Sequence, residues 1–170
     1  AGGVWRSTDF TTANPTWTPL TDFVGVGATG ADRQTGLGAG SLNVGAITVD
    51  PNDLKTIYVG TGEGLYTKAD GGYGSGLLRS TDGGNTFTLI SSGPAIASDG
   101  GLPAFYHRAF NNIIVDPLNS NILFAAVTYA DTSSAINNPW NTTPATYNTA
   151  DGRGIFKGVR DPMTDTFTWT

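Results

Sequence analysis

The sequence predicts an all-β protein assembled from a repeated four-stranded antiparallel unit. Only 14% of its 170 residues are charged, and 24 are Gly. Thr, Val, Ile and aromatic residues alternate with polar residues over short stretches, and no long stretch has helical periodicity. Two similar segments also lie 66 residues apart. Repetition at a fixed spacing is typical of architectures that stack one unit on the next.

The two similar segments, residues 44–60 and 110–126, align without a gap. Each is expected to form two strands whose inward apolar residues are two positions apart. The strands are joined by a turn in which Asp and Asn bond the backbone and Pro fixes φ. The matching positions are Ile47 with Ile113, Val49 with Val115, Asp50 with Asp116, Pro51 with Pro117, Ile57 with Leu123, Tyr58 with Phe124, and Val59 with Ala125.

A second hairpin follows the first, with strands at residues 77–80 and 86–91 around a turn at 81–85. Less regular copies of this hairpin occupy residues 4–20 and 155–170. Four antiparallel strands repeated in series are typical of the blades of a β-propeller. The hairpin tryptophans are expected to pack in the core or between blades: Trp5, Trp17 and Trp169.

The blades divide the chain into five parts. Residues 1–22 are expected to be the second half of a blade, and residues 44–93 and 107–170 are each expected to be a complete blade. Residues 23–43 and 94–106 are then inter-blade loops. A propeller closes with about 4 to 8 blades, and this chain holds about two and a half. We therefore expect a segment of a larger propeller, completed by the remaining blades of a parent chain.

The turn at residues 80–87 has the pattern Ser-x-Asp-x-Gly-x-Thr-aromatic, known as the Asp-box. In this pattern the carboxylate accepts backbone N–H bonds, Gly supplies a positive φ, and the aromatic ring packs between blades. The residues expected to be structural here are Ser80, Asp82, Gly84, Thr86 and Phe87. Asp9, Asp50 and Asp116 are expected to serve their own turns in the same way.

Three stretches, GGVWRSTD, AITVDPNDLKTIYVGTGEG and GLLRSTDGGNTFTLI, resemble the bacterial Asp-box (BNR-like) repeat propellers. That group includes sialidases, xyloglucanases, sortilin-type ectodomains and photosystem assembly factors. The resemblance implies the propeller fold but no single activity, because Asp-boxes recur in catalytic and non-catalytic members.

The resemblance gives limited support to an enzyme. Where xyloglucanases carry a catalytic Asp after a strand Thr, this chain has Thr61-Gly62-Glu63. Glu63 and Asp70 are the catalytic candidates, with a solvated loop carboxylate as the simpler interpretation of Glu63. Glycoside hydrolysis needs two facing carboxylates, and no residue here is identified as the second. Sialidases need three clustered Arg, and the loop residues Arg33, Arg108 and Arg153 have no spacing that predicts such a cluster.

All long insertions are predicted to emerge at the blade face opposite the short turns. They hold aromatic side chains, Phe105 among them, amid Gly, Asn and Ser, which suits stacking on sugar rings or contact with a protein. The ligand-binding candidates are Tyr73, Tyr106, His107, Arg108, Trp140 and Tyr147. The alternative is that the aromatic rings only hold the loops on the propeller, and that His107 and Arg108 only form loop-to-strand hydrogen bonds.

Composition excludes several classes. Without Cys and with one His, the chain has no disulfide, zinc finger or multi-histidine site. A net charge of −5 with scattered basic residues excludes a nucleic-acid partner, and no apolar run predicts a membrane span. No cofactor is expected; Ca²⁺ at the Asp-Gly-Gly turns of Asp70 or Asp99 is an alternative that lacks the spacing of a calcium loop.

The function expected from the sequence is that of a non-catalytic interaction or structural segment of a secreted or cell-surface bacterial or archaeal propeller protein. Its partner would be a glycan or a protein at the long-loop face. One alternative is part of a xyloglucanase-like glycoside hydrolase. Another is a protein-binding propeller of the assembly-factor or sorting-receptor kind.

Overall fold

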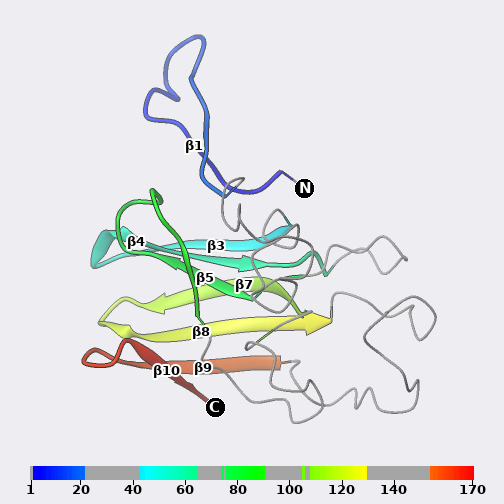
Figure 1. The fold of residues 1–170 in the computed structure, drawn as a ribbon, viewed down its shortest axis with the longest axis vertical. Helices are drawn as coiled ribbons and strands as arrows, with labels where there is room; N and C mark the ends of the chain where they lie inside the picture. Colours follow the sequence, from blue (N-terminus) through cyan, green and yellow to red (C-terminus); the bar gives the residue numbers. More distant parts are fainter. Residues whose placement is uncertain are drawn as a thin grey trace, which may run out of the picture.

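The protein is a stack of antiparallel β-sheets, seen in a computed structural model (Figure 1). The structure describes residues 2–21, 43–64, 74, 76–90, 105, 108–129 and 154–170. In these residues there are two four-stranded sheets, one two-stranded hairpin and no helix. The predicted class, all-β with four-stranded antiparallel units in series, is confirmed.

Each four-stranded sheet is built from two consecutive hairpins. The first sheet has the order β3-β4-β5-β6, and the second has β7-β8-β9-β10. The strands of the first sheet are β3 (Val44–Asp50), β4 (Asp53–Thr61), β5 (Leu77–Ser80) and β6 (Thr88–Leu89). Those of the second are β7 (Arg108–Asp116), β8 (Asn119–Tyr129), β9 (Gly154–Asp161) and β10 (Thr166–Trp169). The hairpin pairs β1 (Trp5–Arg6) with β2 (Thr18–Pro19).

The repeat in the sequence is also a repeat in the pairing of strands. Tyr58 lies opposite Arg79, and Phe124, which is 66 residues after Tyr58, lies opposite Lys157. Likewise Gly60 lies opposite Leu77, and Ala126 lies opposite Ile155. Equivalent residues of the two sheets can therefore be compared directly.

Both faces of the first sheet are apolar. Successive residues along its strands point to opposite faces, and each face is buried against a different neighbour. Tyr58, Leu77 and Ile90 pack on the second sheet, and we call this side the forward face. Val59, Leu78 and Phe87 pack on the β1–β2 hairpin, where they contact the cluster that includes Val4, and we call this side the rear face. The corresponding faces of the second sheet and of the hairpin carry the same names.

The larger core lies between the two sheets. On the second sheet its members come from the rear face, and they include Ile113, Val115, Leu123, Phe167 and Trp169. The edge strands β3 and β7 of the two sheets lie side by side, and the hairpin lies at the top of the stack in Figure 1. The rear face of each layer thus packs on the forward face of the layer before it.

The same side chain has a different environment in the two sheets. Ile113 and Val115 are 3% and 4% exposed, because the first sheet covers them. Their equivalents Ile47 and Val49 are 53% and 44% exposed. The hairpin, which has only two strands, leaves this part of the rear face uncovered.

The expected packing of the tryptophans is correct for Trp169, which is 9% exposed, and wrong for the other two. Trp5 and Trp17 are 47% and 54% exposed. By register, Trp5 is equivalent to Leu78 on the rear face, since each lies one residue before the Arg of its strand. The rear side of the hairpin has no covering layer among the described residues.

Burial at these equivalent positions gives a direct test of the stack. Ile113→Ala is expected to lower the free energy of unfolding by about 2–5 kcal/mol, because it leaves a cavity in the core between the sheets. Ile47→Ala is expected to cost less than about 1 kcal/mol, because half of that side chain is already in water. Urea unfolding of both variants measures the difference. Equal losses would contradict the assignment of the two environments.

Candidate functional site

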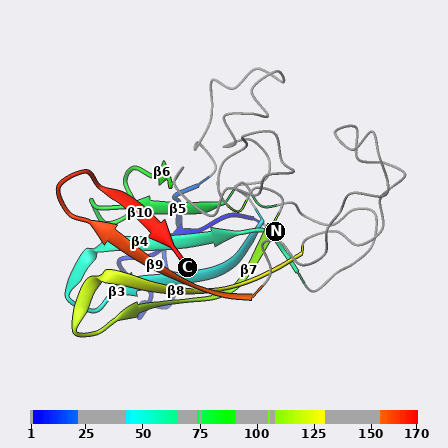
Figure 2. The same ribbon diagram turned by 90° about the horizontal axis from the view of Figure 1, so that it is seen from below.

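The strands begin and end at two opposite edges of the stack, and these edges differ in the connections that they carry. The connections from β3 to β4, β5 to β6, β7 to β8 and β9 to β10 all lie at one edge, on the left in Figures 1 and 2. We call it the turn edge. The strand ends at Thr61, Leu77, Arg108 and Gly154 lie at the other edge, which we call the loop edge.

Asp82 is the centre of the turn between β5 and β6. Its Oδ1 accepts the N–H groups of Asn85 and Thr86, each at 2.9 Å, and its Oδ2 accepts the Thr86 hydroxyl at 2.6 Å. Ser80 Oγ donates to Asp82 Oδ1 at 2.8 Å and accepts the Gly84 N–H at 2.8 Å. Gly84 has φ of 89°, a value that favours Gly. The hydrogen bonds from Thr86 and Ser80 hold the pKa of Asp82 far below its ordinary value.

The turn after β1 repeats this arrangement in spite of being three residues longer. Ser7 Oγ donates to Asp9 Oδ1 at 2.8 Å, and the same oxygen accepts the N–H of Thr16 at 2.8 Å. The bonds from Ser7 and Thr16 lower the pKa of Asp9. The three additional residues therefore leave the hydrogen bonds among Ser7, Asp9 and Thr16 intact.

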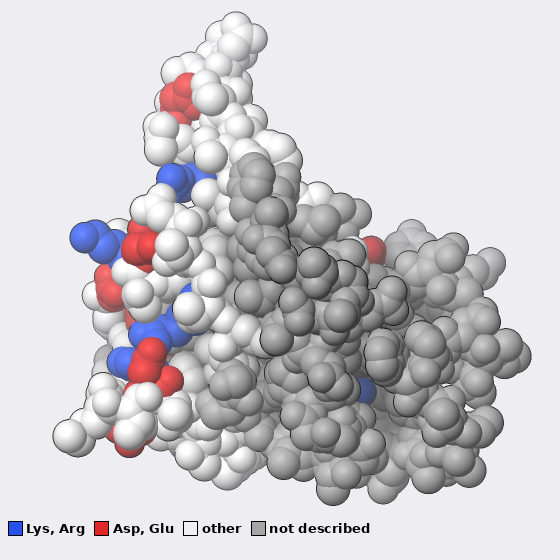
Figure 3. All heavy atoms as spheres, in the orientation of Figure 1, with Lys and Arg blue, Asp and Glu red and all other residues white. Residues whose placement is uncertain are grey.

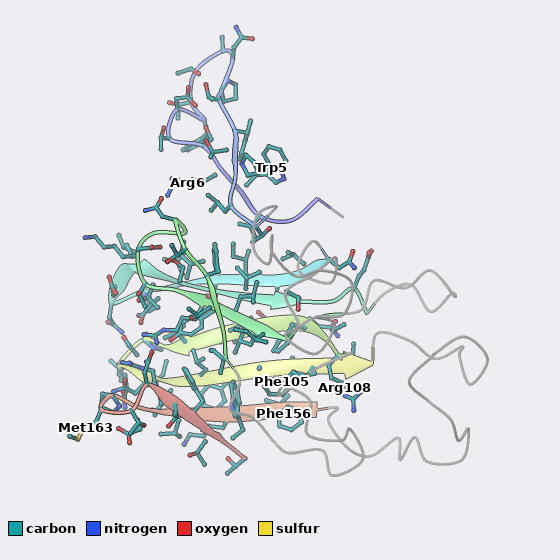
Figure 4. All side chains as sticks on the ribbon, viewed as in Figure 1. Trp5, Arg6, Phe105, Arg108, Phe156 and Met163 are labelled. Carbon is teal, nitrogen blue, oxygen red and sulfur yellow. The ribbon has the colours of Figure 1, made fainter. Side chains whose placement is uncertain are left out.

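The other Asp residues that begin turns also accept backbone hydrogen bonds two residues on. Asp50 accepts the N–H of Asn52, and Asp116 accepts that of Leu118, both at 2.8 Å. Asp161 does the same with Met163 at 2.8 Å, which lowers the pKa of Asp161. Met163 marks this turn in Figure 4. Carboxylates used in this way close turns by accepting backbone N–H groups.

Arginines at the turn edge connect one layer to the next. Arg6 donates to the carbonyl of Gly83 at 2.6 Å, and Arg79 donates to Asp165 at 2.5 Å. Arg160 also bonds Asp165, at 2.9 Å. Burial acts to raise the pKa of Asp165, but the bonds from the two arginines outweigh it and lower that pKa. Figure 3 shows the charged residues gathered along this edge, and Figure 4 shows Arg6 directed from the hairpin to the sheet below it.

The loop edge presents two of the predicted site residues. Thr61, at the end of β4, is fully buried; its hydroxyl donates to the Gly76 carbonyl at 2.6 Å and accepts the Gly76 N–H at 2.9 Å. Glu63 follows two residues later and is half-buried. Arg108 begins β7 at the same edge and is 4% exposed (Figure 4). The structure thus places a carboxylate and a guanidinium on neighbouring sheets at this edge.

Phe105 anchors the segment before β7. Its ring lies 5.2 Å from that of Phe110, 5.4 Å from that of Phe156 and 4.9 Å from that of Trp169, all edge-on. Phe105 is 1% exposed, and its carbonyl accepts the N–H of Arg108 at 3.1 Å. Among the loop aromatics, Phe105 therefore has the packing role and not the binding role.

The remaining predicted candidates lie outside the described residues: Asp70, Tyr73, Tyr106, His107, Trp140 and Tyr147. Asp99, Arg33 and Arg153 also lie outside them. The part of the chain that the structure describes has no group of three His, Asp or Glu side chains able to hold a metal ion. In that same part, no helix has the length and apolarity that crossing a membrane requires.

Comparison with known proteins finds similar solved structures, among them two GH74 proteins. No protein-family model matches the chain, and no curated protein matches it. The GH74 enzyme of Niastella koreensis is 22% identical with a TM-score of 0.49, over 99% of this chain and 18% of that one. The GH74 xyloglucanase from Xanthomonas campestris is 18% identical with a TM-score of 0.39, over 74% of this chain and 14% of that one. The chain therefore spans less than a fifth of the length of either.

The turn geometry predicts an acid-dependent loss of stability. Asp82→Asn is expected to lower the melting temperature at pH 6, because an amide cannot accept the hydrogen bonds that both carboxylate oxygens receive. The pKa of Asp82 is lower in the folded than in the unfolded chain, so its stabilisation is complete above the ordinary value of 3.8 and is lost as the pH falls below it.

Thermal unfolding measured from pH 6 to pH 3 checks this expectation. The difference in melting temperature between the original chain and Asp82→Asn should shrink at the acidic end. Thr81→Ala, at an exposed position of the same turn, serves as the control and should leave the melting temperature unchanged. A difference that stays constant with pH would contradict the role given to the carboxylate.

Proposed function

We propose that this chain is a non-catalytic interaction and structural section of a larger, secreted or cell-surface β-propeller protein, and that it binds a glycan or a protein at its loop edge. One observation carries the proposal. The turn-edge carboxylates Asp9, Asp50, Asp82, Asp116 and Asp161 each accept hydrogen bonds within their own turns. The long connections, by contrast, leave from the loop edge.

Carboxylates fixed in this way suit a scaffold and not acid–base chemistry. A general acid needs a pKa near the working pH, and the hydrogen bonds from Thr86 and Ser80 move the pKa of Asp82 in the opposite direction. The arginines of this edge bond the adjacent layer. These contacts give the turn edge a structural, stabilising role. Variable segments on a fixed scaffold favour a binding role for the loop edge.

The loop edge has suitable chemistry for a polar ligand with flat apolar faces. Glu63 and Arg108 border it with opposite charges. The segments that join it contain Tyr73, Trp140 and Tyr147 among Asn, Ser and Thr. Aromatic rings beside amide and hydroxyl groups stack on sugars and also fill pockets in protein partners.

A glycoside hydrolase is the second candidate, because Glu63 emerges at the loop edge directly after the buried Thr61. Two of the structurally similar proteins are named as a GH74 enzyme and a GH74 xyloglucanase. Such an activity requires a second carboxylate about 5–9.5 Å away. A propeller of the assembly-factor or sorting-receptor kind, which binds protein alone, is the third.

Calorimetric titration of the chain with xyloglucan and other plant and bacterial polysaccharides tests the proposal, together with an assay for released reducing ends. We expect binding without release, and Trp140→Ala should weaken binding about tenfold through loss of ring stacking. Trp17→Ala, an exposed Trp remote from the loop edge, is the matched control and should bind as the original chain does.

The carboxylate variants separate binding from catalysis. Glu63→Gln and Asp70→Asn should retain binding, because each keeps a hydrogen-bonding side chain of the same size. Release of reducing ends that either substitution abolishes would overturn the non-catalytic proposal. Failure of every polysaccharide to bind would remove the glycan and leave the protein-binding class.

A further inference from the structure

Three glycines lie directly against the second sheet at the loop edge. A Cβ atom added to Gly62 or Gly74 would overlap the carbonyl oxygen of Arg108. A Cβ atom added to Gly64 would overlap the methyl group of Thr128. The end of the first sheet is therefore packed onto the beginning of β7 and the end of β8, at the place that Arg108 marks in Figure 4. We call this contact the junction.

Two of the long connections leave the sheets at the junction. Residues 65–73 follow Gly64 and end at Gly74, so this connection begins and ends against the second sheet. Residues 130–153 follow β8, whose Thr128 lies against Gly64. The aromatic ligand-binding candidates in these two segments are Tyr73, Trp140 and Tyr147. We expect a ligand that contacts both segments where they leave the sheets to meet the junction as well.

A β-bulge places the Asn111 side chain at the junction. The pairing of β7 with β8 shifts between Phe110 and Asn112, which leaves Asn111 as the extra residue. A bulge redirects a side chain relative to the regular ladder. The amide oxygen of Asn111 lies 3.2 Å from the position that a Cβ atom on Gly64 would take. The first sheet has the same shift at Gly45, so the bulge does not need the Asn side chain.

Three polar side chains border the junction. The Asn111 amide and the Thr128 hydroxyl can each donate and accept hydrogen bonds, and the Glu63 carboxylate accepts them. Among the described residues, none donates a hydrogen bond to the Glu63 carboxylate, whereas Asp82 at the turn edge accepts three. Arg108 is 4% exposed, so the accessible charge of these residues is that of the half-buried Glu63.

We propose that the junction is a subsite for an uncharged sugar residue and that Asn111 is a residue that selects it; this inference rests on the glycan binding proposed above. Adjacent hydroxyl groups of a sugar ring both donate and accept hydrogen bonds, which matches an amide beside a carboxylate. A sugar that carries its own carboxylate brings a like charge to Glu63, which disfavours its binding. An aromatic ring of the adjoining segments supplies the stacking contact.

Calorimetric titration of Asn111→Ala with xyloglucan tests the subsite. The affinity should fall about tenfold, because the hydrogen bonds of the amide to the sugar are lost. Asn112→Ala is the matched control, since it removes the same side chain one position further on, where the regular ladder pairs it with Ala126. It should bind as the original chain does. Both amides are exposed, so both variants should keep the original melting temperature, which verifies the fold.

A comparison of neutral and acidic polysaccharides tests the part played by Glu63. The original chain should bind a polyuronate at least about tenfold more weakly than xyloglucan at low salt, and the difference should shrink at high salt because salt screens the charges. Glu63→Gln should keep the affinity for xyloglucan, because the amide still accepts a hydrogen bond. The same variant should bind the polyuronate more tightly than the original chain does, because the like charge is removed.

A rescue experiment tests whether the junction positions the subsite. Gly64→Ala adds a methyl group that overlaps the Thr128 methyl group, so it should move Glu63 away from the second sheet and weaken xyloglucan binding about tenfold. Thr128→Ser removes the methyl group at residue 128 and keeps the hydroxyl. The double variant should therefore recover most of the affinity that Gly64→Ala loses.

The possible results distinguish this inference from the proposed function. Xyloglucan binding that Asn111→Ala leaves unchanged would overturn the subsite and leave the glycan-binding function in place. Tighter binding of the polyuronate than of xyloglucan by the original chain would do the same. An original chain that binds no neutral polysaccharide would overturn both the subsite and the proposed binding of a neutral glycan.

Discussion

Both faces of each four-stranded sheet are apolar, and this constraint determines the rest of the architecture. Tyr58 and Leu77 on one side of the first sheet and Val59 and Leu78 on the other are each 1% exposed or less. A sheet with two such faces needs a layer on each side, because exposing either would leave several large side chains in water. The repeat is therefore a layer of a stack and not an independent unit.

The turns determine which connections between strands can vary in length. Aspartates at the turn edge fix short connections by accepting N–H groups within the turn, as Asp50 and Asp116 do at equivalent positions. In a meander, every second connection lies at the opposite edge, so length can be added there without moving the paired strands. In the extended turn that follows Asp9, an insertion is accommodated while the Asp-centred hydrogen bonds persist.

Local features of the fold could be predicted from the sequence, and neighbour-dependent features could not. The aligned copies predicted the paired strands, because alternation and turn residues act within a few positions. They could not distinguish Ile47 from Ile113, since the residue type is the same and only the covering layer differs. The exposure of Trp5 and Trp17 escaped prediction for the same reason. The bond from Arg79 to Asp165 joins residues 86 positions apart, which no local pattern indicates.

The sequence predicts that the long loops next to Glu63 and Arg108 share one edge, but no pattern in it indicates the packing that fixes the separation of these two residues. Added Cβ atoms at Gly62 or Gly74 would meet the carbonyl oxygen of Arg108. The backbone just before Glu63 thus lies directly against the backbone of Arg108 on the next sheet. Any change in how the two sheets pack must move these two charged residues relative to each other. The geometry of the loop edge is therefore set by the same contact between layers that buries the core.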